Sequence, residues 1–162
     1  MAALQRTGKE ITEIYNRHVD TVYRVCYSFM KNRADTEDMV QETFLRLLST
    51  GQTFENDRHE KAWLIVTASN LCKDSLKKWW RRTEPLEDHT VTLAAPESPD
   101  GSLTEAILKL SPRYKDVVYL YYYEGYSTEE IAKHLGCPSA TVRSHLLRAR
   151  KQLMALLGGN LE

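Results

Sequence analysis

The sequence has few cysteines and lacks the marks of a secreted or membrane-spanning protein. Only three cysteines occur in 162 residues, no two have the spacing of zinc ligands, and none of the five histidines clusters with them. We therefore expect buried free thiols, no metal and no cofactor. The start, MAALQRTGKEI, lacks the apolar core of a signal peptide, and no uncharged apolar run is long enough to span a bilayer. These features predict a cytoplasmic protein without membrane insertion.

Strand patterns and catalytic constellations are also missing. No segment alternates apolar and polar residues as a half-buried strand does, whereas apolar residues recur at helical spacing along most of the chain. The fold class is therefore predicted as all-α. No Ser/His/Asp, Cys/His or paired-carboxylate arrangement has supporting context, and no glycine-rich phosphate loop occurs. The sequence thus predicts no catalytic residues, and we expect a protein that is not an enzyme.

The chain has no net charge, but its charges are unevenly distributed. Residues 1–82 hold 14 Lys/Arg against 11 Asp/Glu, and residues 104–162 hold 8 against 6. Residues 83–103 hold no basic residue, five acidic ones, and three prolines with a glycine. This composition predicts two small, mildly basic helical domains joined by a flexible acidic linker, whose acidity is also compatible with a plain spacer.

The first domain is predicted to contain three helices. One helical stripe runs from residue 11 to 29 and includes His18, which we interpret as a core residue and not as a ligand. Asp35 is predicted to cap a second helix, and a third runs from about 58 to 82. The second helix is expected to turn four apolar side chains inward: Val40, Phe44, Leu47 and Leu48.

The second domain is predicted to contain four helices, over about 103–110, 112–124, 127–135 and 138–157. Ser127 with Glu130 forms a capping box, and Gly136 stands where a helix ends in a left-handed residue. A short turn then leads to a longer helix with a basic outer face, the arrangement of a DNA-binding helix-turn-helix. An ordinary helical hairpin with solvated arginines is the alternative. Five tyrosines between 119 and 126 are interpreted as structural.

Two stretches of the first domain carry unusual surfaces. One exposed helix face is shared by Asp38, Gln41, Glu42 and Leu45. This face suits a docking partner, although acidic residues in a first turn also simply favour the helix dipole. Near residue 80, lysines and arginines alternate with two tryptophans. Bases can stack on such rings while cations meet phosphates, but the same pattern also suits an ordinary helix C-terminus.

Together these stretches resemble bacterial sigma factors of the sigma-70 family. DTEDMVQETF, residues 35–44, is similar to the family signature DAEDLVQETF, and residues 54–78 look like the promoter-melting segment that comes after it. Residues 110–153 resemble the C-terminal region with its EIA..LG and TV.S.L.RAR motifs. The small size and two helical domains match the extracytoplasmic-function (ECF) type.

The resemblance implies a subunit that binds core RNA polymerase and directs promoter recognition, DNA melting and transcription initiation. Its expected partners are core polymerase, promoter DNA as duplex and melted single strand, and an anti-sigma factor. The residues that match the face docking on the polymerase clamp are Asp35, Asp38, Gln41, Glu42 and Leu45. Those matching the −10 surface are Phe54, Asn56, Arg58, Asn70, Lys73, Lys77, Trp80 and Arg81. Those matching the −35 surface are Ser139, Thr141, Arg143, Ser144, His145, Leu147, Arg148 and Lys151.

The sequence departs from the family pattern at a few of these positions. Val66 and Ser69 stand where many members have arginines in the melting helix, and His145 stands where they have another arginine. Two of these three departures fall in the segment that matches the −10 surface. A free-standing helix-turn-helix regulator, which would bind duplex DNA without polymerase, remains the alternative function.

Overall fold

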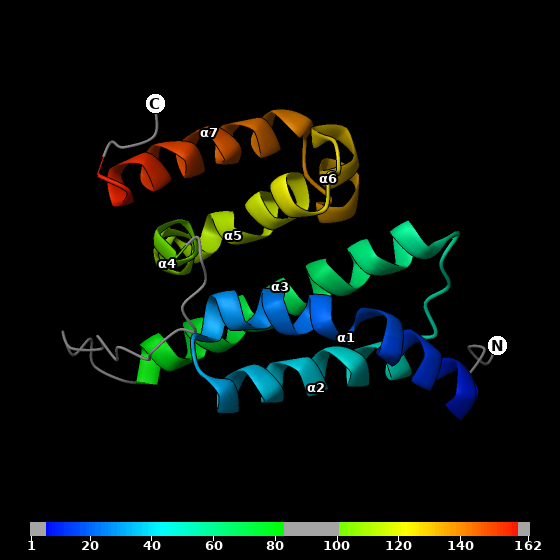
Figure 1. The fold of residues 1–162 in the computed structure, drawn as a ribbon. Helices are drawn as coiled ribbons and strands as arrows, with labels where there is room; N and C mark the ends of the chain where they lie inside the picture. Colours follow the sequence, from blue (N-terminus) through cyan, green and yellow to red (C-terminus); the bar gives the residue numbers. More distant parts are fainter. Residues whose placement is uncertain (1–5, 83–100, 159–162) are drawn as a thin grey trace. The chain divides into compact units, whose positions relative to one another are not determined.

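The computed structural model describes residues 6–82 and 101–158, and all the regular structure in these residues is helical. The chain divides into two compact units, residues 1–72 and 73–162, and each is described by itself. Figure 1 shows the helices in chain order. Most of the predicted acidic linker, residues 83–100, lies outside the described residues, while its last three residues belong to a helix that begins at Gly101.

The first unit is built on α1 (Gly8–Met30), α2 (Arg33–Thr50) and the beginning of α3 (Asp57–Arg82). The first helix starts with a capping box, in which Thr7 accepts the Glu10 N–H and the Glu10 carboxylate accepts the Thr7 N–H. It ends at Lys31, which adopts the left-handed conformation with φ of 66°. The short link after Lys31 returns the chain along α1 (Figure 1).

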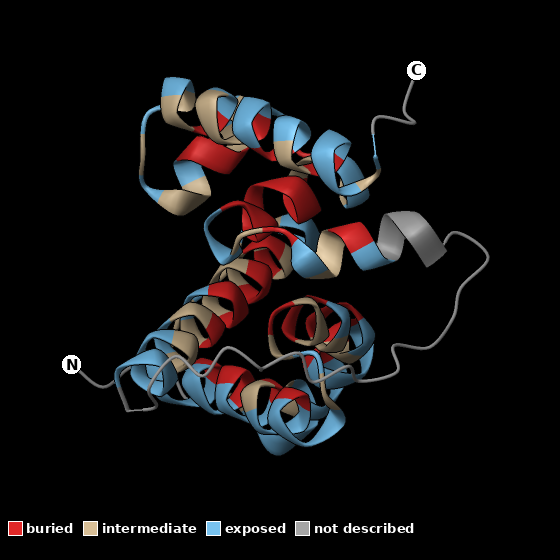
Figure 2. Cartoon of the chain, turned by 90° about the vertical axis from the view of Figure 1, so that its left-hand side faces the viewer, coloured by how far each residue is buried: buried red, intermediate tan, exposed pale blue. Residues whose placement is uncertain are grey.

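Two predictions about α2 were wrong. The cap is Asn32, whose side chain accepts the Asp35 N–H at 2.8 Å, so Asp35 lies in the first turn. Leu48 does not point inward but is 50% exposed, because the buried stripe follows Val40, Phe44 and Leu47. Within each unit the buried residues lie on the helix faces turned toward one another (Figure 2).

The second unit begins with the end of α3 and finishes in a helix-turn-helix. Its other elements are α4 (Gly101–Lys109), α5 (Pro112–Val118), the π-helix η1 (Tyr119–Tyr123), α6 (Thr128–Leu135) and α7 (Ser139–Leu156). The last helix packs on α4, α5 and α6 through Val142, Leu146, Ala149 and Leu153. The predicted single helix over 112–124 thus ends in a wider turn, with the Glu124 N–H bonded to the Tyr119 carbonyl.

The start and end of α6 confirm the sequence signals. Ser127 accepts the Glu130 N–H at 3.1 Å, and the Glu130 carboxylate accepts the Ser127 N–H at 2.9 Å. Gly136 has a φ of 70° and donates its N–H to the Ala132 carbonyl. An L-residue rarely adopts this conformation, so the glycine closes α6 and allows the tight turn into α7.

We expect Ser127→Ala to weaken α6 by about 1 kcal/mol, because the Glu130 N–H loses its acceptor at an exposed helix start. Hydrogen exchange measured peptide by peptide will show this as roughly fivefold faster exchange of the α6 amides. Thr128→Ala is the matched control, since that hydroxyl contacts the Glu129 side chain and caps nothing. Equal exchange in the two variants would contradict the capping role.

Candidate functional site

A groove lies between α1 and α2 on the surface of the first unit. It encloses about 630 Å³ and is lined from α1 by Tyr15, Val19 and Tyr23. The lining residues from α2 are Glu37, Asp38, Val40, Gln41, Phe44, Leu45 and Leu48. Leu45 and Leu48 are each half exposed, and the ring of Tyr15 packs on Phe44 at 4.9 Å. An apolar floor with a carboxylate and an amide at its rim suits a helical partner.

The five predicted docking residues are all exposed, and three of them line this groove. Asp38, Gln41 and Leu45 recur on one face of α2 and form its wall, whereas Glu42 is exposed outside the lining. Asp35 stands at the helix start, where its carboxylate accepts the Asn32 side-chain N–H at 2.8 Å. The structure therefore brings together three of the five residues. The sequence did not predict that Tyr15, Tyr23 and Leu48 complete the groove.

The α2–α3 loop, residues 51–56, carries two of the predicted −10 residues. The Phe54 ring packs against His59 and Trp63, with centroids 5.3 Å and 5.7 Å away. The Asn56 carbonyl and side chain both accept N–H groups from the first turn of α3, including that of His59 at 2.8 Å. Arg58, the next predicted residue, is exposed on that turn. Aromatic packing and capping thus give this loop a defined conformation.

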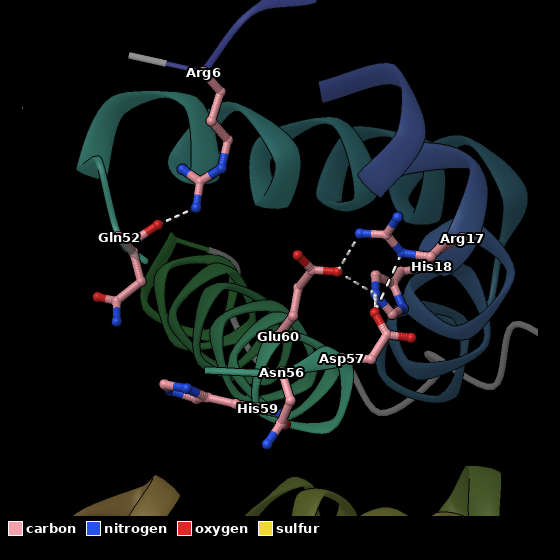
Figure 3. A network of polar contacts seen from close by, with 8 residues as sticks. All are labelled: Arg6, Arg17, His18, Gln52, Asn56, Asp57, His59 and Glu60. Atoms are coloured by element: carbon pink, nitrogen blue, oxygen red, sulfur yellow. Dashed lines mark hydrogen bonds and ion pairs between the residues drawn. The ribbon is translucent and has the colours of Figure 1, made fainter. Parts of the chain in front are cut away.

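A charged network behind the loop joins α1 to the first turn of α3 (Figure 3). Glu60 is buried and accepts hydrogen bonds at 2.8 Å from Arg17 and from the Nε2 atom of His18. Arg17 also lies 3.3 Å from the Asp57 carboxylate. Burial acts to raise the pKa of Glu60, but the bonds from Arg17 and His18 outweigh it and hold the pKa below its ordinary value. The network therefore favours an ionised Glu60.

The same network contains a possible ligand set that we interpret as structural. Ligand atoms of His18, Asp57 and Glu60 lie within 4.8 Å of one another. Arg17 forms ion pairs with both carboxylates, so their negative charge is compensated without a metal ion. His18 is 3% exposed and shares a hydrogen bond with Glu60 through Nε2, so it lies in the core as predicted. Its Nδ1 atom is buried without a hydrogen-bond partner in the described part of the chain, so the residue is only partly satisfied.

The remaining predicted −10 residues are spaced along α3. Asn70, Lys77 and Arg81 are exposed, and Lys73 is half-buried. Trp80 is 55% exposed and meets Trp79 edge to face at 5.4 Å. An exposed tryptophan leaves a large apolar ring in contact with water, which can mark a binding surface. A ring that lies beside several cations is able to stack on an unpaired base. The arrangement therefore fits single-stranded nucleic acid.

The predicted −35 surface lies on α7, the second helix of the helix-turn-helix. Arg143, Leu147, Arg148 and Lys151 are exposed, whereas Ser139, Thr141 and Ser144 are partly buried. Arg143 donates to the Ser139 hydroxyl at 3.2 Å, which orients its guanidinium along the first turn. Three of these four exposed residues are basic, so α7 has an exposed basic face of the kind that suits a groove of duplex DNA.

His145 differs from the other predicted −35 residues. Its ring is half-buried and packs edge to face on Tyr114 of α5 at 5.3 Å. Burial lowers its pKa, and the positive charges of Arg113 and Arg148 act in the same direction, so the imidazole is neutral near pH 7. His145 therefore packs within the unit and brings no charge to a DNA phosphate at neutral pH.

Comparisons with known proteins identify the family of the chain. Residues 14–82 match the family described as Sigma-70 region 2, and residues 100–153 match Sigma-70, region 4. The chain is 35% identical over 152 residues to the ECF RNA polymerase sigma factor SigE of Mycolicibacterium smegmatis, covering 87% of this chain but 59% of that protein. It is 30% identical over 155 residues to the RNA polymerase sigma factor SigV of Bacillus subtilis, covering 93% of each.

Solved structures show the same fold. The sigma factor RpoE of Bartonella quintana, in complex with the anti-sigma factor NepR, has a TM-score of 0.75 and 23% identity, covering 94% of this chain and 99% of that one. The structure of CnrH with the cytosolic domain of CnrY gives a TM-score of 0.64. On the sequence matches, the chain belongs to the sigma-70 family of bacterial sigma factors and to its ECF type. None of the described helices is long and apolar enough to cross a membrane.

Proposed function

We propose that this protein is the promoter-specificity subunit of a bacterial RNA polymerase and acts in the cytoplasm as an initiation factor without catalytic activity of its own. The observation that carries the proposal is the presence of two complementary surfaces on one chain. One is the groove of α1 and α2, with its exposed Asp38, Gln41 and Leu45. The other is the capped helix-turn-helix with exposed basic residues on α7.

The groove is the proposed dock for the clamp helices of core polymerase. Its half-exposed leucines offer apolar area, and the Asp38 carboxylate and Gln41 amide supply directional polar contacts at the rim. The other predicted docking residues, Asp35 and Glu42, would extend the contact along α2. An anti-sigma factor that covers the same groove would keep the protein from polymerase, because the two partners would compete for one apolar surface.

The predicted −10 and −35 surfaces divide promoter recognition between two parts of the sequence. The α2–α3 loop and the Lys/Trp-rich end of α3 are proposed to hold the opened −10 strand, with a base stacked on an aromatic ring. On α7, an arginine such as Arg143 or Arg148 is proposed to bind a guanine at −35 while its neighbours hold phosphates. Because the chain has no net charge, its affinity for non-specific DNA is expected to be low until polymerase delivers it.

Two linked measurements test the proposal. The purified protein is first mixed with sigma-free bacterial core polymerase and passed over a sizing column, where we expect the two to elute together. The complex then transcribes linear templates with a randomised upstream segment, and the templates that give transcripts are sequenced. We expect two enriched elements separated by a fixed spacer. If the free chain binds duplex DNA but never joins polymerase, it is a free-standing regulator and the proposal is wrong.

A further inference from the structure

The α2–α3 loop is held in place by an arginine that precedes the first helix. Arg6 donates a hydrogen bond from Nη2 to the Gln52 carbonyl, although the two residues stand 46 positions apart in the chain (Figure 3). Its guanidinium carbon also lies 5.4 Å from the centroid of the Phe54 ring. One side chain therefore fixes both the backbone at the beginning of the loop and the aromatic ring at its middle.

The other end of the loop is fixed independently of Arg6. Asn56 caps α3, and the Glu55 N–H donates to His59 Nδ1 at 3.1 Å. Arg17 and His18 then hold the first turn of α3 through Asp57 and Glu60. The stretch from Gln52 to Phe54 lies between these anchors and the end of α2. One side of it is held by the packing of Phe54 on His59 and Trp63, and Arg6 adds the contact from the N-terminal segment.

We propose that Arg6 is a positioning residue for −10 recognition, which it serves by holding the α2–α3 loop in the shape that receives the promoter base. The proposal rests on the proposed function, in which Phe54 and its neighbours contact the opened strand. A loop that is ordered before binding loses little conformational entropy when it binds DNA. It also resists the rearrangement that would be needed to accommodate a wrong base. Preorganisation of this kind changes base selectivity more than it changes overall binding.

The chemistry of arginine explains why this residue suits the position. Its planar guanidinium is able to donate in its plane to a carbonyl while one face rests on an aromatic ring. Lysine has a single compact ammonium group, so it replaces one of these contacts at a time. Arg6 is half-buried and both of these contacts lie within the protein, so the role proposed for it is exerted through the loop.

The test compares Arg6→Ala, Arg6→Lys and Lys9→Ala in the randomised-template transcription assay, with each full-length variant bound to core polymerase. Lys9→Ala is the matched control, because it removes an exposed positive charge three residues away. We expect Arg6→Ala to reduce base preference at the −10 element by roughly three- to tenfold and to leave preference at −35 and co-elution with polymerase unchanged. Arg6→Lys should fall between Arg6→Ala and the wild type, and Lys9→Ala should match the wild type.

The outcomes separate this proposal from the function on which it rests. If wild type shows both promoter elements and Arg6→Ala keeps the wild-type −10 preference, the positioning role is wrong while the proposed function stands. A uniform loss of transcription from all templates, with the −10 preference intact, would likewise assign Arg6 to fold stability alone. If wild type enriches no element at all, the proposed function fails and this proposal fails with it.

Discussion

The double variant Asp38→Arg/Gln41→Ala is expected to lose co-elution with core RNA polymerase, with an affinity lower by about 100-fold or more. Both residues line the groove of α1 and α2, and both side chains are exposed there. The change reverses one charge and removes one amide among the residues that line the groove, so it leaves polar groups of the partner unpaired. A sizing column with increasing concentrations of core measures the loss.

A matched control lies on the neighbouring helix. Asn16→Ala/Asp20→Arg makes the same kinds of change at two exposed positions of α1 that do not line the groove. We expect this control to co-elute as wild type does, and both variants to keep wild-type helical content by circular dichroism. Binding that survives in the groove variant, or that fails in both, would mean that the dock lies elsewhere.

Removal of the Glu60 carboxylate is expected to give a large loss of stability in the first unit. In Glu60→Ala the buried Nε2–H of His18 loses its acceptor, and Arg17 loses its shortest ion pair, at 2.8 Å. Unsatisfied buried polar groups of this kind cost about 2–4 kcal/mol. Hydrogen exchange of α1 and α3 peptides measures the effect within this unit, whereas a single unfolding transition of a two-unit chain does not isolate it.

The pH dependence of this effect is set by the lowered pKa of Glu60. A carboxylate whose pKa is lower in the folded state stabilises the fold above its unfolded pKa, and this stabilisation is lost as pH falls through the folded value. The difference in protection between wild type and Glu60→Gln should therefore be constant near neutral pH and shrink below about pH 4. Asp20→Ala, an exposed acid on α1, is the control and should change little. A difference that grows on acidification would contradict the assigned charge state.

The helix-turn-helix could be predicted closely because its signals are local. A capping box at Ser127 and Glu130 and a left-handed glycine at 136 each depend on residues within one turn, and both appear as predicted. The cap of α2 was missed because Asn32 and Asp35 are equally able to cap a helix. Helical spacing placed Leu48 at the edge of the buried stripe, where packing against α1 decides between inside and outside.

Contacts between distant parts of the sequence could not be predicted. The hydrogen bonds from Arg17 and His18 to Glu60 join residues more than 40 positions apart, and no periodic pattern in the sequence predicts such bonds. The same holds for Arg6 and the α2–α3 loop. The groove was foreseen only on its α2 side, because helical spacing predicts which residues share a face but not which face of α1 lies opposite. The assignments of individual residues to −10 and −35 DNA stay predictions.

The π-helix at Tyr119–Tyr123 lets the chain that enters the helix-turn-helix absorb one extra residue. A π-helical turn holds about one residue more than an α-helical turn, and here it is followed by Gly125 at φ of 74° and by an N–H···O bond from Tyr126 to Leu120. An α-helical turn with about one residue fewer would direct the chain after it in nearly the same orientation. Tyr126, which is 2% exposed, would then keep its place in the core. Deletion of one residue from this tyrosine run should therefore be easier to accommodate than insertion of one.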